Sequence, residues 1–132
     1  MATVGDIRQG IATRLATIPG LRTSATMLDD PRPPVAMVIP ERVEYDLTAG
    51  RGVDRYIFIV QLMVSRADER AAQNNLDPYI TGPTSVKTAL FADPTLDGTA
   101  QTSRVTDVRS YGQVIYGETL YLGCEFTVEV YA

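Results

Sequence analysis

The stretch Tyr56–Val64, YIFIVQLMV, is the most apolar run in the chain, and it restricts how the rest can fold. It is too short to cross a membrane as a helix, because a spanning helix needs ~20 apolar residues and this run also contains Gln61. Its β-branched and aromatic residues follow a glycine-rich segment, which predicts the return strand of a hairpin. Such a strand is apolar on both faces, so both need cover, either from this chain or from another subunit.

The composition predicts one ordinary globular domain that spans residues 1–132, with 45% hydrophobic and 21% charged residues. The formal charge of −4 argues against a surface built to bind nucleic-acid phosphates, so no nucleic-acid sequence recognition is expected. Cys124 is the only cysteine, which excludes an intrachain disulfide. The N-terminus lacks the apolar core of a signal peptide, so we expect an intracellular product with no membrane partner.

The N-terminal segment predicts an amphipathic helix. Thr3 and Asp6 have the spacing of a capping box, and Pro19 with Gly20 ends the pattern, since proline cannot continue the hydrogen-bond ladder. The apolar stripe, at spacings of three and four, consists of Val4, Ile7, Ile11, Leu15 and Ile18.

Several strands are expected after this helix. Residues 22–28 are a weak strand candidate, and residues 35–39 a stronger one. Residues 42–47 alternate, which predicts a strand that buries one face. Gly50 and Gly52 then supply the hairpin tip that leads into the opening stretch. The face expected to be buried is made of Val43, Tyr45 and Leu47.

The second half predicts a broken helical region followed by two long strands. Ser65 and Asp68 resemble another capping box, and Pro78 is expected to break the helix that follows. A short helix over 84–92 and strands over 103–111 and 119–130 complete the order. The sequence therefore predicts an α+β fold, with an N-terminal helix and a broken central helix packed on an antiparallel or mixed β-sheet.

Little in the sequence indicates catalysis. The chain has no histidine, which excludes the usual Ser-His and Cys-His nucleophile pairs. Cys124 falls on the apolar face of a strand, where a packed thiol is expected rather than a nucleophile. Glu44 and Asp46 share a strand face and would suit a metal or an acid-base pair, although a solvated face has the same pattern. We expect no enzyme, no catalytic residues, no metal and no cofactor.

The hairpin tip is the candidate contact site, because its charged residues lie on a loop that contributes nothing to the hydrophobic core. We expect its charges to be solvated and available to a neighbouring subunit or another protein. A merely solvated turn would have the same composition. The candidate contact residues are Asp46, Arg51, Asp54 and Arg55.

The layout resembles that of the tail terminator (tail completion, tail-to-head joining) proteins of long-tailed bacteriophages. The resemblance covers nearly the whole chain and rests on layout rather than on an exact signature. Four stretches carry it, namely DIRQGIATRLATIPGL (6–21), VEYDLTAGRGVDRYIFIVQLMVS (43–65), RADERAAQNNLDPYI (66–80) and GETLYLGCEFTVEVYA (117–132).

This resemblance implies a structural role in a virion, at the top of the tail or in the neck, after assembly in the host cytoplasm. Proteins of that family form a ring, usually a hexamer, on the head-proximal end of the tail tube. They end tube polymerisation and join the tail to the head-tail connector or head-closure protein. The implied partners are therefore further copies of this chain, the tail tube protein and the connector.

Two kinds of alternative remain open at the level of sequence. One is another neck, head-closure or tail tube component, which belongs to the same structural class. The other is a small cytoplasmic ligand-binding or enzymatic α+β domain, which a pocket with converging carboxylates would favour.

Overall fold

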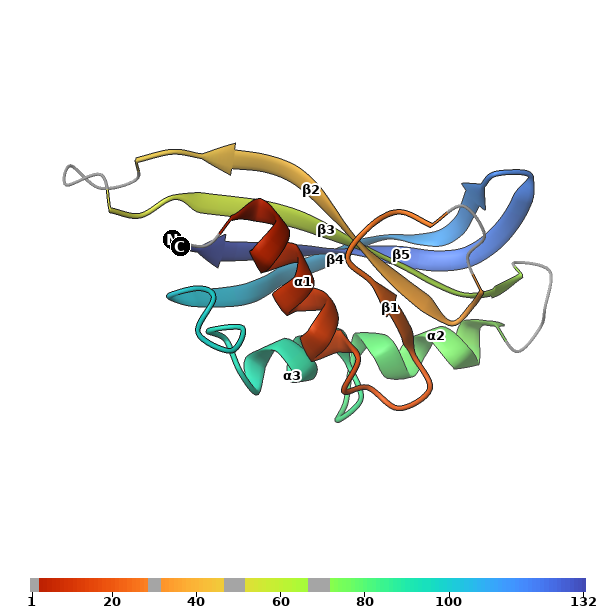
Figure 1. Cartoon of the computed structure of the whole chain (residues 1–132). Coiled ribbons are helices and arrows are strands. Elements are labelled where there is room, and N and C mark those ends of the chain that lie inside the picture. Colours follow the sequence, from red (N-terminus) through yellow and green to blue (C-terminus); the bar gives the residue numbers. More distant parts are fainter. Residues whose placement is uncertain (1–2, 29–31, 47–51, 67–71) are drawn as a thin grey trace.

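The computed structural model describes residues 3–28, 32–46, 52–66 and 72–132. Within them the chain forms an α+β fold in which helices pack on a mixed five-stranded sheet of order β1-β2-β3-β5-β4 (Figure 1). Only β1 and β2 pair in parallel, and the other neighbours are antiparallel. The elements are α1 (Val4–Leu15), β1 (Arg22–Ser24), β2 (Val35–Glu44), β3 (Arg55–Arg66), α2 (Ala72–Ile80), α3 (Val86–Phe91), β4 (Thr102–Tyr116) and β5 (Thr119–Tyr131).

Helix α1 begins as the sequence predicts. The Thr3 hydroxyl accepts a hydrogen bond from the Asp6 amide at 3.1 Å, and the Asp6 carboxylate accepts one from the Thr3 amide at 3.0 Å. This reciprocal pair satisfies two backbone donors that a helix start leaves unpaired. The chain leaves the helix before Pro19 and turns at Gly20, whose φ of +79° is easily adopted by glycine.

Strand β2 joins two segments, 35–39 and the start of 42–47, that the sequence predicts as separate strands. It runs through Pro40 with a register shift between Pro40 and Arg42, because the bulge accommodates a residue that has no amide donor. The expected burial of Tyr45 is wrong, since the strand ends at Glu44 and the Tyr45 side chain is 74% exposed. Leu47, expected on the same face, lies outside the described residues.

Two predictions about α2 are also wrong. Ser65 does not cap a helix, because β3 continues through it and pairs it with Leu122 of β5 after a bulge. Pro78 does not break the helix but lies inside it, near its end. The helical bond from the Thr81 amide to the Asp77 carbonyl spans Pro78, at 3.3 Å. Proline removes the helical bond that its own amide would make, but the later bond across it is formed, so the helix continues to Ile80.

Strands β4 and β5 form a long hairpin that is strongly bent. Its register shifts between Val105 and Asp107 and again between Arg109 and Gly112. Ser110 has a φ of +57°, which is unusual for a residue with a side chain and marks the second irregularity. The bends let the far part of the hairpin leave the plane of the helix-covered sheet (Figure 1).

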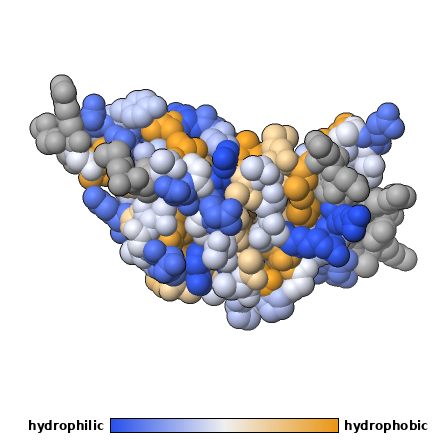
Figure 2. Space-filling model, viewed as in Figure 1, coloured by the Kyte–Doolittle hydropathy of each residue, from blue (hydrophilic) through white to orange (hydrophobic). Residues whose placement is uncertain are grey.

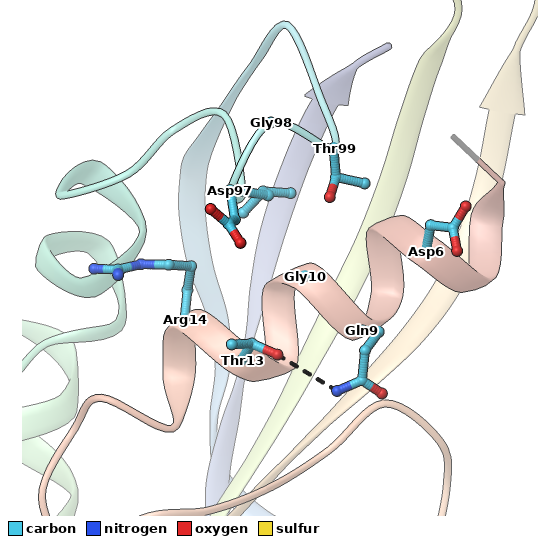
Figure 3. A pocket seen from close by; sticks show the side chains of 9 residues that line it. Asp6, Gln9, Gly10, Thr13, Arg14, Asp97, Gly98 and Thr99 are labelled. Atoms are coloured by element: carbon cyan, nitrogen blue, oxygen red, sulfur yellow. Dashed lines mark hydrogen bonds between the residues drawn. The ribbon is translucent and has the colours of Figure 1, made fainter. Parts of the chain in front are cut away.

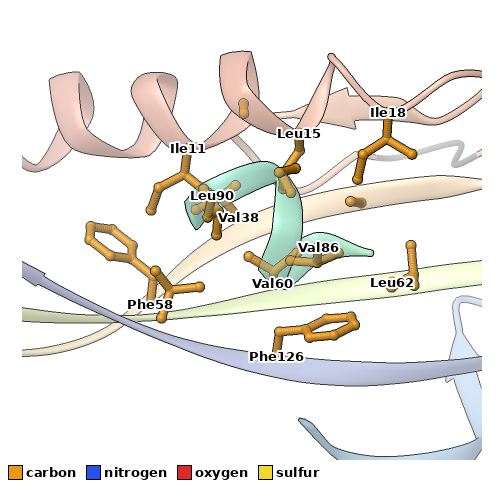
Figure 4. Close-up of a cluster of buried hydrophobic side chains, with 14 of the residues drawn as sticks. Ile11, Leu15, Ile18, Val38, Phe58, Val60, Leu62, Val86, Leu90 and Phe126 are labelled. Carbon is orange, nitrogen blue, oxygen red and sulfur yellow. The ribbon is translucent and has the colours of Figure 1, made fainter. Parts of the chain in front are cut away.

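One face of the sheet carries the main core, and the helices cover it (Figure 4). Phe58 and Phe126 lie at its centre, 1% and 2% exposed, and Ile11 and Leu15 of α1 face them. The prediction that Cys124 lies on the apolar face of a strand is confirmed, because its side chain is completely buried in this layer. Burying each such side chain contributes about 1.5–3 kcal/mol, so this layer dominates the stability of the fold.

The opposite face of β3 is covered by the chain itself. At one end Met63 packs with Met37 and with Leu28, which follows β1. Further along, the Gln61 amide donates to the Cys124 carbonyl at 3.2 Å and is buried. Near the start of the strand, Ile57 is only 3% exposed, between charged residues of β2 and β5. The doubly apolar strand therefore needs no second subunit to cover it.

Candidate interaction surface

The β2–β3 arm extends beyond the helix layer at one end of the sheet (Figure 1). Asp46 turns away from β2 with a φ of +54°, and its amide donates to the Asp54 carboxylate at 2.9 Å. The Asp54 backbone in turn exchanges hydrogen bonds with Ala132 at 2.8 and 3.1 Å. Two of the candidate contact residues thus brace the base of the arm. Arg51 lies outside the described residues.

Arg55 is placed differently from what the sequence suggests. It is the first residue of β3, its side chain is 29% exposed, and it forms an ion pair with Glu44 of β2. A second carboxylate, that of Glu129, lies 4.0 Å away. The Tyr131 hydroxyl and the Glu44 carboxylate hold the pKa of Arg55 above its usual value. Arg55 therefore links three strands and is not a free charge on a turn.

These pairs continue across the sheet as an ion-pair network made of Arg42, Glu44, Arg55, Arg104 and Glu129. Arg104 of β4 donates to Glu129 at 3.2 Å, and Arg42 lies 3.8 Å from Glu44. The charges alternate in sign from strand to strand, so neighbours attract rather than repel. Arg42 and Glu129 are the cross-strand partners of Ile57, so the aliphatic stems of these two residues help to cover it.

A second group of ion pairs centres on Arg109 of β4. Its guanidinium lies 3.7 Å from Glu41 and 3.6 Å from Glu125. Neither of these two ion pairs was predicted from the sequence. Alternation gives the face on which a charge lies, whereas only strand register tells which charges are neighbours.

The β4–β5 turn forms a second projection, at the opposite end of the sheet from the β2–β3 arm (Figure 1). Ile115 and Leu120 are partners across the hairpin, and they are 76% and 39% exposed. Large exposed aliphatic side chains in adjacent positions often mark a contact surface. Figure 2 shows the apolar residues of its view as separate patches between hydrophilic ones.

A polar groove of about 580 Å³ lies between α1 and the loop before β4 (Figure 3). Asp6 lies at one end and Asp97 nearer the other, so the two carboxylates do not converge. Arg14 is already bound, since its guanidinium donates to the Ala89 carbonyl at 3.1 and 3.2 Å. Leu96 closes the floor, where a Cβ on Gly10 would come within 3.2 Å of its side chain.

Chemistry at Cys124 is restricted by burial. Removal from water raises the pKa of its thiol to about 12. The reactive thiolate is therefore almost absent near neutral pH. In the part of the chain that the structure describes, no three His, Cys, Asp or Glu residues form a group that could hold a metal ion.

We expect the thiol of the folded protein to resist alkylation at pH 8 and to react fully once the chain is unfolded. Between pH 9.0 and about 12 the native state holds the thiol proton that the unfolded chain loses, so stability falls as pH rises. Cys124→Ala should cost about 1 kcal/mol at neutral pH and should reduce that alkaline slope. Denaturant curves of both proteins at several pH values measure this. Rapid labelling of Cys124 in the folded protein would contradict the conclusion that its thiol is buried and unreactive.

No protein-family model matches the sequence, and a search of curated proteins finds no relative. Among the described residues, no helix is long and apolar enough to cross a membrane.

Proposed function

We propose that the chain is a structural phage protein of the tail-terminator type. It caps the head-proximal end of the tail tube as a ring, ends tube polymerisation and joins the tail to the connector. The proposal comes from the resemblance of sequence layout. The structural observation that supports it best is the pair of arms, which extend from opposite ends of one sheet (Figure 1).

Two projecting arms suit a protein that must touch more than one neighbour. The β2–β3 arm presents Tyr45, and the β4–β5 turn presents Ile115 and Leu120. Contacts are usually placed on segments that a rigid scaffold holds in position. The doubly apolar β3 does not contribute to the argument, since the chain covers both of its faces.

The proposal is tested by deleting the gene from a phage that encodes it and imaging the particles by electron microscopy. We expect tails of irregular or excessive length, few joined particles and a large loss of infectious titre. Expression of the intact chain in trans should restore both. A reconstruction of the tail top should contain a closed ring of this chain. Normal tails and normal titre after deletion would refute the proposal.

A point substitution at the β2–β3 arm separates assembly from folding. Tyr45→Asp should leave the melting temperature nearly unchanged, because the side chain is mostly in water. The same variant should lower the yield of joined particles, since a carboxylate in an interface is costly. Arg55→Glu is the contrasting variant. It should lower the melting temperature, because it places a third carboxylate beside Glu44 and Glu129.

Wild-type titre from Tyr45→Asp would show that the arm makes no contact through this residue. An unchanged melting curve for Arg55→Glu would show that the ion pairs do not stabilise the sheet. The second result concerns stability alone and leaves the proposed function intact.

A further inference from the structure

The end of the β4–β5 hairpin combines apolar and acidic groups. Ile115 and Leu120 are paired across the two strands, so their side chains lie on the same face of the hairpin. Glu118 lies in the turn between them and is exposed. This combination, called here the hairpin knob, consists of Ile115, Glu118 and Leu120. Water surrounds most of Ile115, which is 76% exposed.

The connection between α2 and α3 forms a recess of about 570 Å³. Its charge is positive, opposite to the negative charge of the hairpin knob. Its apolar lining includes Ile80, Pro83 and Phe91, and Phe91 is 79% exposed at the end of α3. Among the described residues, Lys87 is the only charged side chain that lines it, and it is also the only lysine of the full sequence. We call these four residues the α2–α3 recess. Its apolar surface is open to any partner that brings apolar side chains and a carboxylate.

The knob and the recess cannot meet within one chain. The knob lies at the far end of the bent hairpin, whereas the recess lies on the helical layer (Figure 1). Strand pairing fixes the position of the knob, and packing of the helices against the sheet fixes the position of the recess. A contact between them therefore has to join two copies.

We propose that the hairpin knob of one copy docks in the α2–α3 recess of a second copy. The complementarity is of two kinds. Ile115 and Leu120 would lose water against Ile80, Pro83 and Phe91, and the carboxylate of Glu118 would approach the ammonium of Lys87. Opposite charges at the rim of an apolar contact orient the partners and reject other orientations.

The contact joins two different surfaces, so it can close reciprocally as a pair, repeat around a rotation axis as a ring, or continue as an open filament if the rotation does not close. Only the ring rests on the proposed function. The docking itself rests on the exposed apolar side chains and the opposite charges of the two surfaces.

Disulfide trapping tests the docking directly. Two proteins are prepared in a Cys124→Ala background, one with Glu118→Cys and the other with Lys87→Cys. They are mixed at high concentration under mild oxidation. Two cysteines that docking holds side by side have a raised effective concentration, so we expect the mixed species to form at least about tenfold faster than in the control mixture. The control pairs Glu118→Cys with Gln9→Cys, because Gln9 is exposed on α1 and away from the recess.

A charge exchange tests the orientation. Glu118→Lys or Lys87→Glu alone should weaken self-association, measured by sedimentation, by about tenfold or more. The double variant Glu118→Lys with Lys87→Glu should recover most of it. Trapping no faster than the control, or two single variants without effect, would overturn the proposal.

The proposed tail function and the proposed docking can be refuted independently of each other. Efficient trapping with a dimer as the largest species, and normal tails after gene deletion, would keep the docking and remove the tail function. Defective tails without specific trapping would keep the function and remove the docking.

Discussion

Replacing Phe58 with aspartate is expected to abolish soluble folding. The side chain is 1% exposed at the centre of the helix-covered layer, where its ring stacks near that of Tyr56 with centroids 6.4 Å apart. Losing a buried phenylalanine costs about 3–5 kcal/mol, and an unpaired buried carboxylate adds several more. The sum is comparable with the whole stability of a typical domain, about 5–15 kcal/mol. Expression in the soluble fraction and circular dichroism measure the result.

The chain supplies a matched control in Phe91→Asp. It makes the same chemical change at a side chain that is 79% exposed, so the dilute protein should fold and melt almost as the wild type does. A soluble Phe58→Asp protein with a cooperative melting transition would contradict the position given to this strand. A Phe91→Asp protein that fails to fold would show that the effect does not come from burial.

Gly123→Ala is expected to have the second largest effect, although it adds a single methyl group. Gly123 lies in β5 opposite Met63 of β3, and a Cβ there would overlap the Leu62 carbonyl oxygen and lie 3.3 Å from the Met63 Cα. Backbone atoms inside a sheet cannot rotate aside as a side chain can. We expect a loss of about 3 kcal/mol or more, because overpacking against backbone is at the upper end of such costs. The melting temperature should fall by roughly 10 °C or more.

Gly52→Ala is the control for this substitution. A Cβ at Gly52 would meet nothing within 4 Å, and no left-handed φ is required there. The two variants remove the same backbone freedom from the unfolded chain, so their difference reports the native clash. Equal melting temperatures for the two variants would show that β3 and β5 separate easily at this point.

The candidate site could be predicted only in part. The sequence placed Asp46 and Asp54 at the hairpin end, whereas the hydrogen bond between them at the base of the arm became visible only in the structure. Arg55 has the same sequence context but belongs to β3, where register brings it to Glu44 and Glu129. The second of these partners lies more than seventy positions along the chain. No local pattern contains that information, because strand pairing decides it.

The sequence by itself determined the elements whose signals are local. The capping box of α1, the return strand Tyr56–Val64 and the position of Cys124 on the apolar face of β5 depend on spacings of two to four residues, and the structure confirms them. Only the tertiary structure decided how the second face of β3 is covered, that Gly123 must lack a side chain, and that Pro78 is held within a helix. These depend on which distant segments are brought into contact. The energy of such contacts overrides local preference, since most of the stability of an element comes from packing.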